Sequence, residues 1–346
     1  MWVLGLESSC DETAVAVYNR TTRDFHEAIA RQLHTHAPYG GVVPELASRC
    51  HLETVAPLTQ RACADAGIAL RDVRLIAATA GPGLAGALIV GLSFAKALAV
   101  GLHVPFVAVN HIEAHMYAAG AETDVTPPFL ALVVSGGHTL LADVHDVLRY
   151  EIVGRTRDDA AGEAFDKGAK LLGFGYPGGI EIERQARAGN PRAIAFPRAM
   201  LHDASDDFSF AGLKTALLYF LRDHPEAARA DVAASYQEAI VDVLVGKTMR
   251  AAQARGRTTV VIGGGVSANA RLRERFAAAG ARCGVRVVLP AFNLCTDNAR
   301  MIAHRGDCVY AARGADALTA DIFPSFFAPA RAGRLTTVAG AVHAAS

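Results

Sequence analysis

The chain has 346 residues, of which 51% are hydrophobic and 20% charged, and its 34 Lys and Arg residues balance 34 Asp and Glu residues. This composition excludes a disordered or fibrous chain, and the zero net charge excludes a global basic field that would bind a polyanion by releasing counterions. Any contact with nucleic acid must therefore come from a local patch or be shared with a partner. The length suits two packed domains with a cleft between them.

The cysteines and the apolar segments indicate the compartment. The six cysteines form no CxxC pair and no framework spacing, which is typical of reduced thiols. Trp2–Glu7 already has the pattern of a strand, so we expect no signal or transit segment. The longest apolar stretch, 86–104, contains Lys96 and His103, and we interpret it as a buried core helix and not as a membrane span. These features predict a cytoplasmic protein with no membrane partner.

Two stretches of the chain follow one pattern, in which an apolar strand, a short polar turn and a second strand succeed one another. They are 2–18, with its turn at 8–12, and 129–144, with its turn at 135–138. Such a repetition predicts a duplicated unit.

Between and after these hairpins the chain alternates helical and strand patterns. Helices are predicted at 44–66, 86–104, 163–172, 213–222, 231–255, 268–279 and 297–312. Strands are predicted at 75–79, 106–109, 259–262 and 286–289. An Ala- and Gly-rich tail follows, which we expect to be peripheral.

Two hairpin-led α/β halves with glycine-rich turns are typical of the duplicated actin-like, sugar-kinase and Hsp70 (ASKHA) fold, in which the turns point at phosphates in a central cleft. We expect the first half at 1–125 and the second at 126–346. The last helix, about 297–313, is expected to pack back at the interface.

His111 and His115 stand four residues apart, which on a helix places both imidazoles on one face at metal-ligand distance. The alternative is two histidines near a helix start, one a cap and one exposed, and for an isolated HxxxH this alternative is the commoner. Glu113 would lie about 200° around the helix from His111. That position argues against a protease with Glu113 as general base and favours a supporting or structural role.

The segment before the last predicted helix contains a candidate for a third metal ligand. Thr296 or Asp297 would ordinarily cap this helix. A catalytic metal site with open positions needs a further protein ligand beside the two histidines, however, and Asp297 is the best candidate.

Two glycine-rich turns are candidates for binding anions. Residues 135–138 lie between two strands, and paired glycines let backbone N–H groups approach a phosphate; a plain hairpin turn is the alternative. Residues 263–269 run from a strand into a helix and offer a helix N-terminus to a phosphate or a wall to a nucleoside. The second turn lacks GxGxxG and the Walker lysine, so it is neither a Rossmann nor a P-loop motif.

Four carboxylates lie in residues 158–167, ahead of an apolar helix. The helix macrodipole explains Asp158, Asp159 and Glu163, whereas Asp166 lies deeper in the helix. The following segment, 176–179, is predicted to be a turn whose glycines matter only if a ligand comes close.

Taken together and in this order, these motifs resemble the TsaD family of tRNA threonylcarbamoyladenosine transferases over nearly the whole chain. The matching segments are GLESSCDET, YGGVVPELASR, TAGPGLAGALIVG, NHIEAH, LVVSGGHT, DDAAGEAFDK, YPGG, DFSFAGLKT, GGGVSAN and CTDN. The chain departs from the family pattern at Ala114, at Ile180–Glu181 and at Ala299–Arg300.

The resemblance implies transfer of a threonylcarbamoyl group from threonylcarbamoyl-AMP to N6 of adenosine 37, in tRNAs that read codons starting with A, with release of AMP. It implies one divalent metal ion, Fe(2+) or alternatively Zn(2+), held by His111, His115 and Asp297. The residues implied to hold the donor are Val134, Ser135, Gly136, Gly137, His138, Asp166, Gly179 and Asn269. Ser9, Asp11 and Glu12 lie in the first turn; we assign catalytic roles to Asp11 and Glu12, with Asp11 as the base.

The resemblance also implies partners. His138 replaces the Asn, and Val133 the ligating Tyr, that archaeal and eukaryotic relatives usually carry, so a bacterial-type site with three ligands is expected. Bacterial relatives work with an inactive paralogue (TsaB-type), a small P-loop ATPase (TsaE-type) and a separate enzyme that makes the adenylate. Arg49, Arg198 and Lys214 are our candidate contacts to tRNA.

The chemistry agrees with this hypothesis, because a carbamoyl carbon with a phosphate leaving group needs charge stabilisation more than a covalent nucleophile. A sugar or acetate kinase of the same fold would not need HxxxH. An inactive scaffold paralogue should have lost both the histidines and the glycine turn. A metallopeptidase is disfavoured by the position of Glu113.

Overall fold

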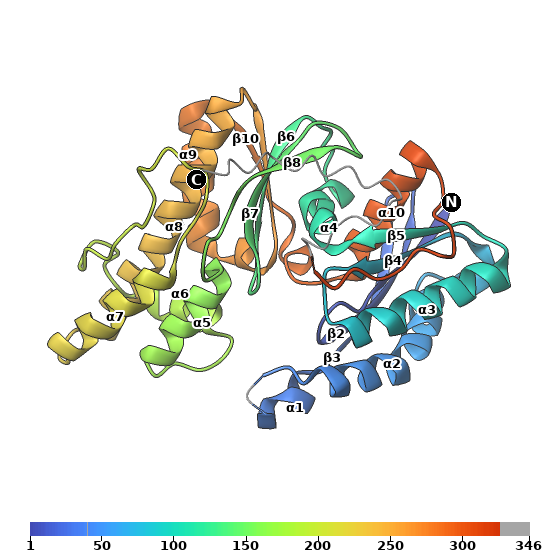
Figure 1. Ribbon diagram of the computed structural model, residues 1–346, viewed down its shortest axis with the longest axis horizontal. Coiled ribbons are helices and arrows are strands. Elements are labelled where there is room, and N and C mark those ends of the chain that lie inside the picture. Colours follow the sequence, from blue (N-terminus) through green and yellow to red (C-terminus); the bar gives the residue numbers. More distant parts are fainter. Residues whose placement is uncertain (40, 326–346) are drawn as a thin grey trace, which may run out of the picture. The chain divides into compact units, whose positions relative to one another are not determined.

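The computed structural model describes residues 1–39 and 41–325 (Figure 1). The chain divides into two compact units: Met1–Val125 with the described residues from Asp297 onward, and Thr126–Thr296. Each unit is built on one five-stranded sheet. Most of the predicted peripheral tail lies outside the described residues.

The sheet of the first unit has the order β3-β2-β1-β4-β5. β1 pairs antiparallel with β2 and parallel with β4, β2 pairs antiparallel with β3, and β4 pairs parallel with β5. The strands are β1 (Trp2–Glu7), β2 (Glu12–Asn19), β3 (Phe25–Arg31), β4 (Val73–Gly81) and β5 (Phe106–Asn110). The carboxyl ends of β1, β4 and β5 therefore meet at one edge of the sheet.

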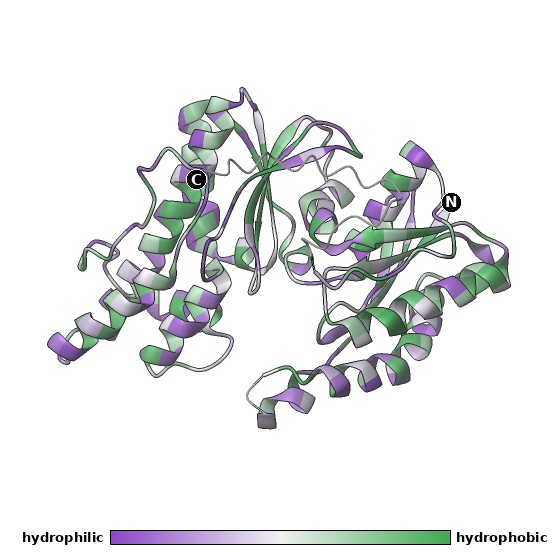
Figure 2. Cartoon of the chain, in the orientation of Figure 1, coloured by the Kyte–Doolittle hydropathy of each residue, from purple (hydrophilic) through white to green (hydrophobic). Residues whose placement is uncertain are grey.

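Helices cover both faces of this sheet. The helices of the unit are α1 (Leu33–His36), α2 (Pro44–Asp65), α3 (Ala85–Leu102), α4 (His111–Tyr117) and α10 (Ala299–Arg313). Successive residues of β1 point to opposite faces, so Leu4 joins a core with residues of α2 and α3, whereas Val3 joins a second core with Met301 and Ile302 of α10. In Figure 2 much of β4 and β5 has the green colour of hydrophobic residues.

α10 packs directly on β1. A Cβ atom on Gly5 would lie 2.4 Å from the carbonyl oxygen of Ala299, so glycine is required at this crossing. This close packing groups the residues from Asp297 onward with the first unit, whereas the sequence prediction assigned 126–346 to the second half with the last helix packing back.

α3 is the single helix among the described residues that has the length and apolar composition of a membrane span. It packs against β4 and α2, and its inward face contributes Leu92 and Ala95 to the core. One apolar face of α3 is therefore buried in the core of the first unit.

The sheet of the second unit has the order β10-β9-β6-β7-β8. Its strands are β6 (Phe129–Val134), β7 (Thr139–Val144), β8 (Tyr150–Arg155), β9 (Thr259–Gly263) and β10 (Arg286–Val288). β6 pairs antiparallel with β7 and parallel with β9, as β1 does with β2 and β4. Both sheets therefore share one topology, which confirms the duplication that the repeated hairpins predict.

The helices of the second unit enclose one large core. They are α5 (Ala161–Leu171), α6 (Gly178–Ala186), α7 (Ala211–Asp223), α8 (Arg229–Ala254) and α9 (Ala270–Cys283). Leu130, Leu132 and Val134 of β6 pack in this core with Tyr236 and Ile240 of α8. Short 3-10 helices lie at Ala37–Tyr39, Leu70–Asp72, Ala118–Ala121, Gly265–Ala268 and Phe292–Leu294.

The elements that were not predicted from the sequence include β3, β8, α6 and the short α1. β3 and β8 are edge strands with mixed polar and apolar residues. The prediction of a bare turn at 176–179 was wrong in part, because α6 begins at Gly178 and buries Ile182 and Ala186 on one face.

Candidate functional site

The two histidines of HIEAH lie at the start of a short helix that follows β5 directly. Asn110 is the cap of this helix, since its Oδ1 accepts the backbone N–H groups of Ile112 and Glu113 at 2.8 and 3.2 Å. Neither histidine is therefore a cap, and neither is exposed: His111 is 7% and His115 1% accessible. The alternative interpretation, in which one histidine caps the helix and the other is exposed, is therefore wrong.

Asp297 lies against both histidines. Its Oδ1 is 3.4 Å from Nε2 of His111 and 3.1 Å from Nε2 of His115. One ligand atom from each of the three residues lies within 4.8 Å of the others. Two imidazole nitrogens and a carboxylate oxygen form a donor set that suits Zn(2+) or Fe(2+), with positions left for other ligands, so the residues fit a divalent metal ion.

Asp297 is free for this role because the next residue caps the helix. The side chain of Asn298 accepts the backbone N–H of Met301 at 2.8 Å and begins α10. The sequence left Thr296 and Asp297 as the possible caps. In the structure the cap is Asn298, and Asp297 faces the histidines.

Glu7, the last residue of β1, supports His111 from behind. Its Oε2 lies 3.0 Å from Nδ1 of His111 and accepts the hydroxyl of Thr79 at 2.7 Å. Its Oε1 accepts the backbone N–H of Ser9 at 2.6 Å. With Nδ1 bonded to Glu7, the Nε2 atom of His111 is the one presented to Asp297, which is the usual arrangement of carboxylate, histidine and metal.

Electrostatics couple this group of residues. Burial opposes charge on Glu7 and on Asp297, but the neighbouring His111 lowers the pKa of both carboxyls. Burial also opposes a proton on His111, yet Asp297 and Glu7 together raise its pKa well above the ordinary value. The cluster therefore holds a proton at His111 in competition with any bound cation.

Glu113 points away from the two histidines. Its Oε2 accepts Nη2 of Arg305 at 2.6 Å, and this guanidinium lies 4.4 Å from the ring of Tyr117. Glu113 and Arg305 are both buried, so the pair joins α4 to α10. This is the structural role expected from the position of Glu113 on the helix, and it argues against a protease-type general base.

The first turn, between β1 and β2, holds the candidate catalytic carboxylates. Glu12 pairs with Arg31 at 3.0 Å. Burial raises the pKa of Glu12, Arg31 lowers it, and the charges of Asp297 and Asp11 raise it again. Burial, helped by Asp11, raises the pKa of Cys10 to about 12, so its thiol is no nucleophile at neutral pH.

The backbone of the first turn is fixed by His51, which the sequence analysis did not single out. His51 is fully buried, with Nε2 3.0 Å from the carbonyl oxygen of Cys10 and Nδ1 2.7 Å from the hydroxyl of Thr13. The SRCH segment at 48–51 carried no spacing signal for this contact, because it depends on α2 packing against the hairpin.

The second turn, between β6 and β7, is closed by Ser135 and His138. The backbone N–H of Ser135 donates to the carbonyl of His138 at 2.8 Å, and the N–H of His138 donates to Oγ of Ser135 at 3.1 Å. No described residue accepts the N–H groups of Gly136 and Gly137, and a Cβ on either glycine would meet open space. Two adjacent donors are thus available to an anion.

Gly264 supports this turn. A Cβ there would lie 2.4 Å from the carbonyl oxygen of Val134, and its φ of 90° also favours glycine. Asn269, farther along the same segment, caps α9 by accepting the N–H of Leu272 at 2.9 Å and donates to Gln237 at 2.8 Å. Both polar groups of the Asn269 side chain are therefore used within the second unit.

Asp166 holds the start of α6, since it accepts the N–H of Gly178 at 2.8 Å. A Cβ on Gly178 would lie 2.6 Å from Cα of Asp166, whereas one on Gly179 would meet nothing closer than 3.9 Å. Gly178 is thus required by packing, and Gly179 leaves space beside the turn.

Asp158 serves a different helix from the one we expected. Its side chain accepts the backbone N–H of Phe210 at 2.7 Å and of Ala211 at 3.2 Å, and so supports the start of α7. The macrodipole of α5 is therefore the wrong explanation for Asp158. Asp159 and Glu163 do lie at the start of α5, where both pair with Lys167 at 2.7 Å.

The first unit brings together His111, His115 and Asp297, and the first turn reaches this group through Ser9, whose Oγ lies 3.3 Å from Nδ1 of His111. The candidate donor-binding residues all belong to the second unit.

Known proteins resemble this chain over most of its length. The family model for TsaD, described as tRNA N6-adenosine threonylcarbamoyltransferase, matches residues 25–304. A relative with that name from Geobacter sp. (strain M21) is 52% identical over 310 residues, which are 89% of this chain and 91% of the relative. Another, from Salinibacter ruber, is 50% identical over 335 residues, 94% of this chain and 99% of the relative.

Solved structures with low sequence identity share the fold. T. kodakarensis HypF has a TM-score of 0.61 at 14% identity, covering 90% of this chain and 48% of HypF. Component A of (R)-2-hydroxyglutaryl-CoA dehydratase from Acidaminococcus fermentans has a TM-score of 0.53 at 13% identity, covering 89% and 99%. These likenesses, with the two duplicated sheets, confirm the ASKHA fold.

Proposed function

The chain belongs to the TsaD family of tRNA N6-adenosine threonylcarbamoyltransferases, and we propose that it transfers the threonylcarbamoyl group of threonylcarbamoyl-AMP to N6 of adenosine 37 in tRNAs that read codons starting with A. In this reaction a bond forms between N6 and the carbamoyl carbon, the bond from that carbon to the phosphate oxygen breaks, and AMP leaves. The observation that carries the proposal is the cluster of His111, His115 and Asp297, three buried or half-buried ligands contributed by two distant segments.

His111, His115 and Asp297 would hold one divalent ion, Fe(2+) or Zn(2+). When bound, such an ion supplies a Lewis acid that stabilises negative charge on oxygens of the donor. Glu7 holds the Nδ1 proton of His111 and so keeps Nε2 available as the ligand atom.

The glycine turn would bind the donor through backbone N–H groups. Val134 to His138 offers the donors of Gly136 and Gly137, and Asp166, Gly179 and Asn269 shape the same unit of the protein. Because Asp166 and Asn269 already bond to the backbone, we expect them to position the site more than to contact the donor.

Asp11 is our candidate for the base that takes the proton of the exocyclic amine, and Glu12 for its neighbour in the first turn. Burial raises the pKa of Glu12 above its ordinary value, and a raised pKa is a common property of carboxyls that act as acids or bases. Cys10, between Ser9 and Asp11, is excluded as a nucleophile by its raised pKa.

The organisation of the enzyme follows from the same membership. We propose residues 1–125 with the last helix as one half and the remainder as the other, a cytoplasmic location, and work alongside an inactive TsaB-type paralogue and a small TsaE-type P-loop ATPase. The neutral net charge supports shared binding of tRNA.

The test is a transfer assay with the full chain. The chain, its two expected partners and the adenylate-forming enzyme are incubated with ATP, bicarbonate, labelled threonine and unmodified tRNA, and label on tRNA is counted. We expect label that depends on this chain and is lost with Asp297→Ala. Absence of label, with the adenylate demonstrably made, would contradict the proposal, and phosphorylation of a small molecule by ATP would instead identify a kinase.

A further inference from the structure

A second charged site lies in the second unit, away from the glycine turn in sequence. It is a pocket of about 350 Å³ between α8, α9 and the segment that connects α6 to α7. Its lining residues are Pro191, Arg192, Ile194, Ala195, Arg198, Glu238, Asp242 and Arg275. We call this group the arginine pocket.

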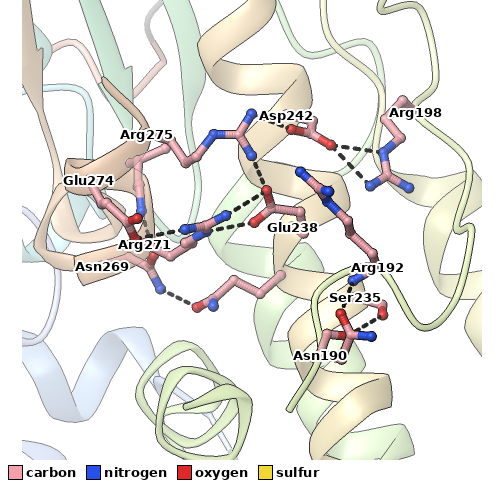
Figure 3. Close-up of polar contacts among 12 residues, drawn as sticks. Asn190, Arg192, Arg198, Ser235, Glu238, Asp242, Asn269, Arg271, Glu274 and Arg275 are labelled. Carbon is pink, nitrogen blue, oxygen red and sulfur yellow. Dashed lines mark hydrogen bonds and ion pairs between the residues drawn. The ribbon is translucent and has the colours of Figure 1, made fainter. Parts of the chain in front are cut away.

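Two carboxylates of α8 organise the arginines. Glu238 accepts Nε of Arg271 at 2.7 Å and also pairs with Arg275. Asp242, one helical turn later, accepts Nη2 of Arg275 at 2.8 Å and Nη2 of Arg198 at 3.0 Å. Figure 3 shows these guanidinium groups gathered around the two carboxylates. Each carboxylate thus holds two arginines in a fixed orientation.

Positive charge is in excess at the pocket. Its lining has three guanidinium groups, of Arg192, Arg198 and Arg275, against two carboxylates. Arg192 is exposed, and its guanidinium forms no hydrogen bond or ion pair with any residue that the structure describes. Burial lowers the pKa of Arg275, and repulsion from Arg282, Arg192 and Arg198 lowers it further. An anion at the pocket would relieve this repulsion.

Pairing of the two helices does not explain the whole arrangement. Arg271 and Arg275 suffice to join α9 to α8, but Arg192 and Arg198 come from the connecting segment. Arg198 is fixed from both sides, since it pairs with Asp242 and its Nη1 donates to the carbonyl of Phe196 at 2.5 Å. A fixed guanidinium beside an unpaired one is an arrangement that suits a phosphate.

The lining also indicates which part of a nucleic acid would enter. None of the lining side chains is aromatic, so the pocket offers guanidinium donors but no surface on which a base could stack. Because the chain has no net charge, binding of a polyanion needs a local site of this kind.

We propose that the arginine pocket binds a backbone phosphate of the RNA substrate, with Arg192 and Arg198 as the contacting residues. The proposal rests on the proposed function for the identity of the substrate. Of the three residues that the sequence suggested as tRNA contacts, Arg198 is the one that lines this pocket.

The experiment measures binding of a labelled, unmodified tRNA transcript to the full-length chain at several salt concentrations. Arg192→Ala should weaken binding on the order of tenfold and reduce the slope of log Kd against log salt by about 1, and Arg192→Ala with Arg198→Ala should reduce it by about 2. Arg222→Ala is the matched control, because Arg222 is an exposed arginine of the same unit on α7. Circular dichroism checks that each variant is folded; Arg198→Lys, which keeps the charge, should fall between the wild type and Arg198→Ala.

Several outcomes would overturn the proposal: unchanged binding by both alanine variants, or an equal loss with Arg222→Ala, which would mean a non-specific charge effect. Titration with inorganic phosphate and with AMP provides a second arm. Loss of phosphate or AMP binding at unchanged tRNA binding would assign the pocket to a free anion and contradict the RNA assignment.

The transfer assay separates this proposal from the proposed function. If the wild type labels tRNA, the variants should raise KM for tRNA and leave kcat unchanged. A contact to a backbone phosphate contributes equally to binding of the ground state and of the transition state. Label transfer with unchanged binding by the variants would defeat the pocket alone. Binding of tRNA that depends on Arg192, in a chain that transfers no label, would defeat the proposed function alone.

Discussion

Glu7 and His111 meet in a buried contact of 3.0 Å between Oε2 and Nδ1, across 104 residues of chain. The hydroxyl of Thr79 and the backbone N–H of Ser9 hold the carboxylate from two other directions. Glu7 cannot reorient without breaking these bonds, so the imidazole of His111 is fixed as well. The contact therefore fixes the orientation of one candidate metal ligand, His111, in the metal-free protein.

Glu7→Gln should lower the metal affinity of the folded protein by about 10- to 100-fold, because supporting partners of ligating histidines contribute on this scale. The measurement is a competition titration with a chromogenic chelator, using Zn(2+) as the probe. Glu53→Gln is the charge-matched control, since Glu53 is exposed on α2. Equal affinities of Glu7→Gln and the wild type would show that the contact does not act on the metal.

Asp297→Asn should abolish transfer and reduce metal affinity by at least about 100-fold, because the amide removes the one anionic ligand of the three. The fold should survive, since α10 is capped by Asn298 and not by Asp297. Asn298→Ala is the reciprocal variant: it should cost about 1 kcal/mol of stability through loss of the cap and retain the metal. Metal content and urea denaturation measured on both variants give the comparison; metal retained by Asp297→Asn would contradict the ligand assignment.

Glu113→Ala should destabilise the protein by about 3–5 kcal/mol, because it leaves the buried guanidinium of Arg305 without its partner. Removing both charges, as Glu113→Ala with Arg305→Met, should recover much of this loss. The metal content of the folded fraction should stay equal to that of the wild type. A folded Glu113→Ala protein without metal would instead make Glu113 part of the metal site.

His304 of α10 makes stability depend on pH. Burial, helped by the positive charges of Arg305 and Arg23, lowers its pKa from 6.5 to about 4. The unfolded chain binds a proton at this side chain below pH 6.5, whereas the folded chain does so only near pH 4. Stability from this group is therefore complete above pH 6.5 and is lost as the pH falls toward 4.

Urea denaturation at pH 7 and at pH 5 should reveal this effect. The wild type should lose about 2 kcal/mol more between the two pH values than His304→Gln does, because one pKa unit corresponds to about 1.4 kcal/mol. His224→Gln, at a half-exposed site after α7, should behave as the wild type. An equal loss in all three proteins would assign the acid sensitivity to other groups.

The sequence predicted the central strands better than the edges of the sheets. β1, β6 and β7 begin and end at the predicted residues, because each is an apolar run that ends at a polar turn. β3 escaped prediction because an edge strand is half exposed and shows no clean alternation. α6 escaped because it starts with two glycines, which are poor helix formers.

For the candidate site, the sequence indicated those residues that stand at a recognisable spacing or that belong to a common type of metal ligand. The HxxxH motif gave His111 and His115, and the search for a carboxylate gave Asp297. Glu7 could not be found in this way, because a single acid at the end of an apolar strand has no spacing to its partner. Asp158 was assigned to the wrong helix for a related reason, since its contact with Phe210 spans 52 residues.

The duplication gives Glu7 a counterpart within the same molecule. β1 and β6 are both six residues long and occupy the same place in sheets of the same order, so Glu7 corresponds to Val134. With a valine there, β6 still forms its hairpin with β7 and its parallel pairing with β9. A buried acid at this strand end is thus dispensable for the architecture and costs desolvation. The two halves therefore compare a valine and a glutamate at the same position of one fold. Val134 adds to the hydrophobic core of the second unit, whereas Glu7 buries a charge in the first.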